Sequence, residues 1–92
     1  MRIRWTTPAA HDLTRICDYI AEHDGAAPAR RVALTIYERI DSLAGFPLRG
    51  RPGRVADTRE LVIPGLPYLA VYRVKGDVIE VSRVLHGAQK WP

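Results

Sequence analysis

Residues 58–85 read TRELVIPGLPYLAVYRVKGDVIEVSRVL, and this stretch decides the fold. It contains three runs rich in Val, Ile, Leu and Tyr, a composition typical of β-strands. The runs are residues 58–63, 68–74 and 78–85. The turn residues PGLP separate the first two runs, and KGD separates the last two at the length of a hairpin loop. The stretch therefore predicts a three-stranded antiparallel meander.

Upstream of the meander, residues 8–23 are predicted to form a helix. Apolar side chains recur there at the i, i+3, i+4, i+7 spacing of one helix face. They are Leu13, Ile16, Cys17 and Ile20. We expect Thr7 to be the N-cap and Pro8 to take the first helical position, where a missing N–H costs nothing. Gly25 is a natural stop.

A second helix follows almost at once. Its apolar stripe consists of Ala29, Ala33, Ile36, Ile40 and Leu43, widened by Tyr37 and Ala44. Pro28 lies near the first turn, where proline is tolerated, and Gly45 and Pro47 end the helix. Two such helices form an antiparallel hairpin. The hairpin cannot bury its own stripes completely, so it must lie on the sheet.

The sequence RIRW at residues 2–5 alternates polar and apolar residues, which predicts a short strand with Ile3 and Trp5 pointing inward. We expect this strand to join an edge of the meander. The predicted fold class is α+β, of order β-α-α-β-β-β. It consists of an N-terminal strand, an antiparallel helical hairpin and a three-stranded antiparallel meander. The hairpin packs on one face of the resulting four-stranded sheet.

The chain has 92 residues, enough for one domain, residues 1–92, with a modest core. Its formal net charge is +4. Residues 1–48 contain six acidic and six basic side chains, whereas residues 49–92 contain eight basic and four acidic ones. Twelve of the fourteen bases are arginine, whose planar fork suits phosphates and carboxylates. A basic half indicates an anionic partner, nucleic acid or an acidic protein segment; a merely solvated surface is the alternative reading.

Several classes of site are excluded by composition and spacing. One cysteine rules out a disulfide framework, and the three histidines are scattered without ligand spacing, so we predict no metal and no cofactor. Cys17 is expected to be a small buried hydrophobe. The longest uncharged apolar stretch, residues 61–72, is interrupted by two prolines and too short to span a membrane. Without a signal-peptide pattern, the cytoplasm is the expected location.

Basic residues on and beside the sheet remain as candidates. Arg59, Arg83 and His86 could bind a phosphodiester and move protons, since histidine titrates near neutral pH. The alternative is structural: Arg59 could pair with a nearby carboxylate, and Arg83 and His86 have opposite parity on a regular strand. A second set of candidates would bind a target or nucleic acid. It consists of Arg49, Arg51, Arg54 and Arg73.

Five sequence motifs resemble the RelE/ParE superfamily of type II toxin–antitoxin toxins over essentially the full length. They are WT followed by AxDLxxIxxYI at residues 5–20, FPxxGRxGR at 46–54, TRELVI at 58–63, YxxVYRV at 68–74 and RVLHG at 83–87. The resemblance implies the fold derived above. It also implies a small basic protein that arrests growth and is neutralised by a cognate acidic antitoxin encoded beside it.

The superfamily divides by target. One branch cleaves mRNA in the ribosome with basic residues, histidine or tyrosine on the sheet; the other poisons DNA gyrase without established hydrolytic activity. The cleaving branch often has arginine in a third-strand YRLVY run. Here the run is YLAVY, so Leu69 stands at that position, and lysine is scarce. These features favour the ParE-like branch.

Three hypotheses follow from the resemblance. The first is a ParE-like toxin that binds DNA gyrase. The second is a RelE-like endoribonuclease acting on mRNA in the ribosome, in which Arg59 and Arg83 hold the phosphate and His86 acts as general acid or base. The third is a family member that binds its antitoxin but has weak toxicity or none.

Overall fold

The computed structural model describes all 92 residues and contains the three strands of the meander. They are β3 (Arg59–Val62), β4 (Tyr68–Lys75) and β5 (Val78–His86). Each pairs antiparallel with its sequence neighbour, as predicted. One irregularity interrupts β4 and β5: Val71 pairs with Arg83 but Tyr72 pairs with Val81, which leaves Ser82 as an extra residue.

The N-terminal strand β1 (Arg2–Trp5) joins the sheet beside β5, as predicted, and runs parallel to it. A fifth strand, β2 (Arg51–Pro52), pairs with Arg59 and Glu60 of β3. The predicted sheet of four strands is therefore wrong by one, because two residues between glycines, one of them a proline, carry no strand signal of their own. The complete order is β1-β5-β4-β3-β2, a mixed sheet.

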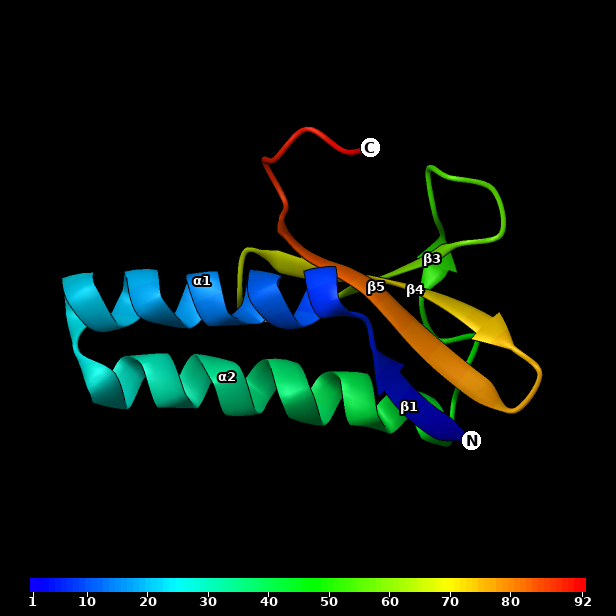
Figure 1. The fold of residues 1–92 in the computed structure, drawn as a ribbon, viewed down its shortest axis with the longest axis horizontal. Helices are drawn as coiled ribbons and strands as arrows, with labels where there is room; N and C mark the ends of the chain where they lie inside the picture. The colour runs from blue at the N-terminus through cyan, green and yellow to red at the C-terminus, as the bar shows by residue number, and fades with distance from the viewer.

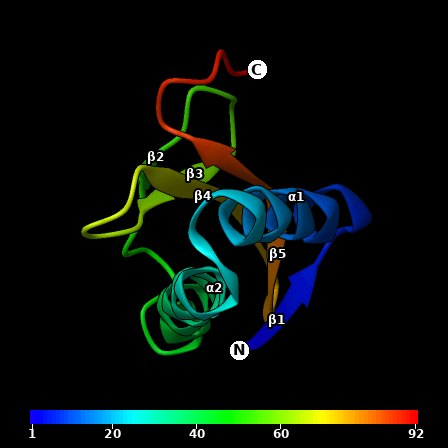
Figure 2. The same ribbon diagram turned by 90° about the vertical axis from the view of Figure 1, so that its left-hand side faces the viewer.

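The helical hairpin consists of α1 (Thr7–Asp24) and α2 (Ala26–Asp41), and the 3₁₀ turn η1 (Ser42–Ala44) continues α2. Gly25 alone connects the helices, with a φ of 101° that favours glycine. Figures 1 and 2 show both helices running along the same side of the sheet. Neither helix combines the length and apolarity needed to cross a membrane.

The predicted N-cap of α1, Thr7, is wrong by one residue. Thr6 is the cap: its hydroxyl accepts a hydrogen bond from the Ala9 N–H at 3.3 Å. The same hydroxyl donates to the carbonyl oxygens of Val81 and Ser82, each at 3.0 Å. Thr6 therefore fastens the start of α1 to the irregularity in β5, a second role that only the tertiary fold reveals.

The main core lies between the hairpin and the sheet. Its fully buried members include Ile36, Ile40, Leu43, Tyr72, Ile79 and Val81. Each buried aliphatic side chain of this kind contributes about 1.5–3 kcal/mol. Ile3 and Trp5 pack against this core from β1, which confirms that they point inward.

Tyr72 also fixes the loop that leads from the helices to β2. Its hydroxyl accepts a hydrogen bond from the Gly50 N–H at 2.9 Å and donates to the Pro47 carbonyl at 2.8 Å. Glycine is required at position 50, because a Cβ there would lie 2.7 Å from the tyrosine ring. The FPxxGRxGR segment is therefore held against β3 and β4 from inside the core.

Candidate functional site

The sheet face turned away from the helices, which we call the open face, carries most of the strand charges. Directly paired residues of neighbouring strands point to the same face, so the register assigns its side chains in rows. The rows are Arg2–Val78–Lys75, Arg4–Glu80–Arg73, Arg83–Val71–Glu60–Arg51 and Leu85–Leu69–Val62. Six basic side chains thus face two carboxylates. Two of the six come from β1, in the half of the sequence that is neutral overall.

Glu60 is the acidic centre of one end of the open face. It is 2% exposed, and its carboxylate accepts hydrogen bonds from Arg51 Nη2 and from the Arg54 backbone N–H, both at 3.1 Å. Arg54 Nε lies 3.6 Å away as well. Burial alone would raise the pKa of the Glu60 carboxyl, but these donors and positive charges hold it below its ordinary value. Glu60 therefore stays ionised and fixes Arg51 and Arg54 in place.

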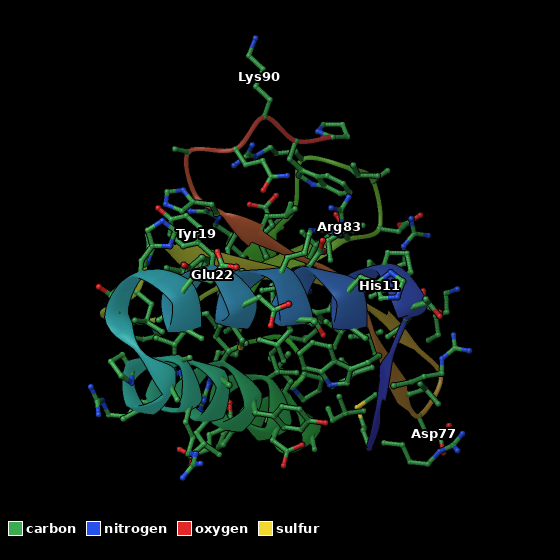
Figure 3. The ribbon with its side chains drawn as sticks, turned by 60° about the vertical axis from the view of Figure 1, so that its left-hand side comes forward. His11, Tyr19, Glu22, Asp77, Arg83 and Lys90 are labelled. Atoms are coloured by element: carbon green, nitrogen blue, oxygen red, sulfur yellow. The ribbon has the colours of Figure 1, made fainter.

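Arg83 is held by Asp12 of α1. Its Nε and Nη2 donate to the two oxygens of this buried carboxylate at 2.7 and 3.0 Å, and the pairing raises the pKa of the Arg83 guanidinium. Asp12 also accepts from the Val84 backbone N–H at 3.0 Å and from Arg15 Nη2 at 2.6 Å. β1 pairs with β5 only as far as Val81, and beyond that point Asp12 accepts the hydrogen bond from the Val84 N–H that a neighbouring strand would otherwise accept. Figure 3 shows Arg83 between α1 and the C-terminal segment.

Arg59 lies on the helix-side face, because it pairs with Tyr72 rather than with an open-face residue. Its Nη1 donates to the carbonyl oxygens of Gly50 at 2.8 Å and Leu48 at 3.4 Å. The structural alternative predicted that Arg59 would pair with a nearby carboxylate, and no such ion pair forms. The guanidinium instead braces the main chain of the basic loop.

His86 ends β5 and is exposed. Its Nδ1 accepts a hydrogen bond from the Ala88 N–H at 3.1 Å, and its ring meets that of Tyr68 edge-on at 5.7 Å. Burial raises the pKa of the Tyr68 hydroxyl. A hollow of about 380 Å³ at this end of the sheet is lined by His86 and Tyr68 together with Arg51 and Arg54.

The structure does not bring Arg59, Arg83 and His86 together. The register between Arg83 and His86 is regular, so the two lie on opposite faces, as their parity indicates. Arg59 shares the helix side with His86 but pairs with Tyr72 in the middle of β4, whereas His86 pairs with Tyr68 at its start. Of the target-binding candidates, Arg51 and Arg54 line the same hollow as His86.

The two other basic candidates stand apart from this cluster. Arg49 places its guanidinium 4.5 Å from the centre of the exposed Phe46 ring and donates to Ser42 Oγ at 2.9 Å. Arg73 lies in the centre of the open face opposite Glu80 and forms no ion pair. Arg49 and Arg73 thus have no carboxylate partner, and Arg73 is the one of these two that lies on the open face.

The C-terminal segment returns to the open face and places Trp91 on its apolar strip. The ring packs against Leu69, Val71 and Leu85, and the Arg83 guanidinium lies 5.7 Å from its centre. Arg54 Nη1 donates to the Trp91 carbonyl at 3.3 Å. Leu69, which stands where the cleaving branch has arginine, is thus 5% exposed beneath a tryptophan.

Sequence reasoning missed the roles of Asp12, Glu60 and Trp91. Asp12 belongs to the AxDLxxI motif and lies at the edge of an apolar helix face. This position in the motif was the available signal that its carboxylate has a partner in the fold. Glu60 alternates with apolar strand residues as surface positions do, so nothing in the pattern indicates its burial. Cys17, expected to be a small buried hydrophobe, is only half-buried, and this partial burial raises the pKa of its thiol.

Comparisons with known proteins agree with this architecture. The family described as the ParE toxin of the type II toxin–antitoxin system parDE matches residues 3–91. Y4kP of Sinorhizobium fredii is 47% identical over 91 residues, covering 99% of this chain and 93% of that protein. Toxin RelE2 of Caulobacter vibrioides is 40% identical over 88 residues, covering 96% and 97%.

Two solved structures are similar as well. A chain of the chromosomal ParDE system from P. aeruginosa superposes with a TM-score of 0.88 at 32% identity, covering 94% of this chain and 95% of that one. A chain of the RelBE2 toxin–antitoxin complex from Mycobacterium tuberculosis gives 0.67 at 24% identity over 92% and 95% of the two chains, a likeness of fold alone.

Proposed function

Because the chain belongs to the ParE toxin family, within the RelE/ParE superfamily of type II toxin–antitoxin toxins, we propose that it arrests growth as a ParE-like toxin. It does so by binding DNA gyrase in the cytoplasm rather than by cleaving RNA. A cognate acidic antitoxin neutralises it.

The observation that carries this proposal is the separation of Arg59, Arg83 and His86. A phosphodiester-cleaving site needs an acid or base and phosphate-holding cations within hydrogen-bonding reach of one substrate. Arg83 is instead committed to Asp12 on the open face, and Arg59 to main-chain carbonyls on the helix side. This arrangement supports a protein that works through a binding surface.

Two observations support the antitoxin as partner. The similar chain from P. aeruginosa, at 32% identity, belongs to a ParDE toxin–antitoxin system. The open face of this chain presents six basic side chains against two carboxylates, which complements an acidic protein segment.

A RelE-like endoribonuclease is the second candidate, favoured by the hollow that His86 and Tyr68 share with Arg51 and Arg54. In that case His86 would move the proton and the two arginines would hold the phosphate. Arg59 and Arg83 would then be positioning residues.

Inducible expression with two readouts, the DNA-damage response and global translation, tests the proposal. We expect a DNA-damage response, and equal toxicity of the wild type and His86→Gln, which keeps a polar side chain but cannot titrate. Loss of a general acid or base would slow cleavage by about 10²–10⁴-fold. Discrete mRNA cleavage sites by primer extension, present with His86 and absent in the glutamine variant, would establish the RelE-like activity instead.

A further inference from the structure

β1 leaves one edge of the sheet unpaired. It is the terminal strand of the order β1-β5-β4-β3-β2, and Figure 2 shows no helix or strand beyond it on its outer side. The N–H groups of Arg2 and Thr6 bond to β5 and the turn before it, at the carbonyl oxygens of Asp77 and Val81. Because backbone groups alternate along a strand, those of Ile3 and Trp5 point away from β5. They form a short row that another strand can pair with.

The side chains along this edge differ between the two faces. Arg2 and Arg4 point to the open face, where a hollow of about 430 Å³ lies between them and Lys75. Arg4 and Lys75 both pair with Glu80, so a single carboxylate balances two cations. Arg2 has no ion pair. This corner of the open face therefore keeps a net positive charge.

On the helix side the same edge is aromatic. Trp5 stacks on Tyr37 of α2 with ring centres 5.3 Å apart, and Tyr37 is 51% exposed. A strand added beside β1 would thus place alternate residues next to two arginines and the residues between them next to the half-buried Trp5 and the exposed Tyr37.

We propose that the outer edge of β1 binds an extended segment of the antitoxin in which acidic and apolar residues alternate; this rests on the proposed function. The acidic residues lie opposite Arg2 and Arg4, the apolar ones contact Trp5 and Tyr37, and main-chain hydrogen bonds to Ile3 and Trp5 supply the register. A second copy of this chain fits poorly, because edge-to-edge pairing would set arginines against arginines.

The charge is tested with the toxin and its cognate antitoxin, which the proposed function expects to be encoded beside it. We expect Arg2→Glu to weaken the complex by about tenfold or more in Kd, because it places like charges across the interface. Arg30→Glu is the matched control, since Arg30 is exposed on α2, also without an ion pair. Equal weakening in both variants, or in neither, would overturn the proposal.

The backbone is tested with a second pair of variants. Ile3→Pro and Ile3→Ala lose the same packing, but only proline removes the outward N–H. Thermal melting first checks that both variants are folded. We then expect the proline variant to bind the antitoxin several-fold more weakly than the alanine variant. In the wild-type complex, we expect amide exchange at Ile3 and Trp5 to slow. Unchanged exchange would overturn the edge assignment while leaving the antitoxin partnership intact. If the wild type binds no antitoxin at all, the proposed function itself fails and this inference with it. A toxin dimer abolished by Ile3→Pro would assign the edge to a second copy and overturn the proposal.

Discussion

Replacing Asp12 by alanine should destabilise the fold more than any other substitution on the outer side of α1. Asp12 is 3% exposed and its two oxygens receive four hydrogen bonds. The donors come from its own helix, from the Arg83 guanidinium and from the β5 backbone at Val84. No other side chain of α1 joins the helix to a strand edge in this way.

The cost can be worked out donor by donor. The buried Val84 N–H loses its acceptor, at about 1–3 kcal/mol. The Arg83 side chain is 29% exposed, so after partial rehydration its two charge-assisted bonds contribute about 1–2 kcal/mol. Arg15, with 67% of its side chain exposed, adds little. The loss is about 3 kcal/mol, and at about 4–8 °C per kcal/mol it lowers Tm by about 12–24 °C.

Urea denaturation followed by tryptophan fluorescence measures this loss, because Trp5 and Trp91 report from the two faces of the sheet. Asp18→Ala is the matched control, an exposed carboxylate on the same helix without an ion pair. A free energy of unfolding for Asp12→Ala within about 1 kcal/mol of this control would refute the reasoning, since surface substitutions already vary by about 0.5 kcal/mol.

Three further predictions concern the loop and the open face. The pKa of Glu60 is lowered in the folded protein, so its ionised carboxylate stabilises the fold above pH 4.5, and this contribution is lost as pH falls toward the folded pKa. In urea titrations, the difference in free energy of unfolding between wild type and Glu60→Gln should therefore shrink from pH 7 to pH 3.5. A constant difference would contradict this prediction. Tyr72→Phe leaves the Gly50 N–H without its acceptor and should lower the free energy of unfolding by about 1–3 kcal/mol in the same urea titrations. An unchanged free energy of unfolding would contradict this role of the hydroxyl. Arg73→Ala should reduce toxicity at equal expression while leaving Tm unchanged, because Arg73 is on the open face without an ion pair. Arg30→Ala on α2 should do neither, and equal toxicity of the two variants would refute a role for Arg73.

The strands and helices could be predicted because their apolar residues follow the period of each element closely. The meander has two clear turns, and the helix stripes repeat without interruption until Gly25 and Gly45. Strand β2 could not be predicted, since its pairing comes from β3 and from the Tyr72 hydroxyl rather than from its own two residues.

The candidate site was harder to predict, because its geometry depends on partners far apart in the sequence. The parity of Arg83 and His86 correctly placed them on opposite faces once the strand proved regular between them. Dividing the charge by sequence halves gave an incomplete picture. Parallel pairing of β1 with β5 carries Arg2 and Arg4 onto the same face as Arg73, so the basic surface draws on both ends of the chain.

That same pairing sets the order in which the molecule can be completed. Among the helices and strands of the fold, β1 comes first in the chain, and the strand beside it, β5, comes last. Contacts between such distant segments form late, after the local hairpins. A chain still being translated can assemble its helices but has no neighbour for β1 and no finished open face. A shortened chain ending before Val78 would therefore leave Ile3 and Trp5 without the strand that orients them.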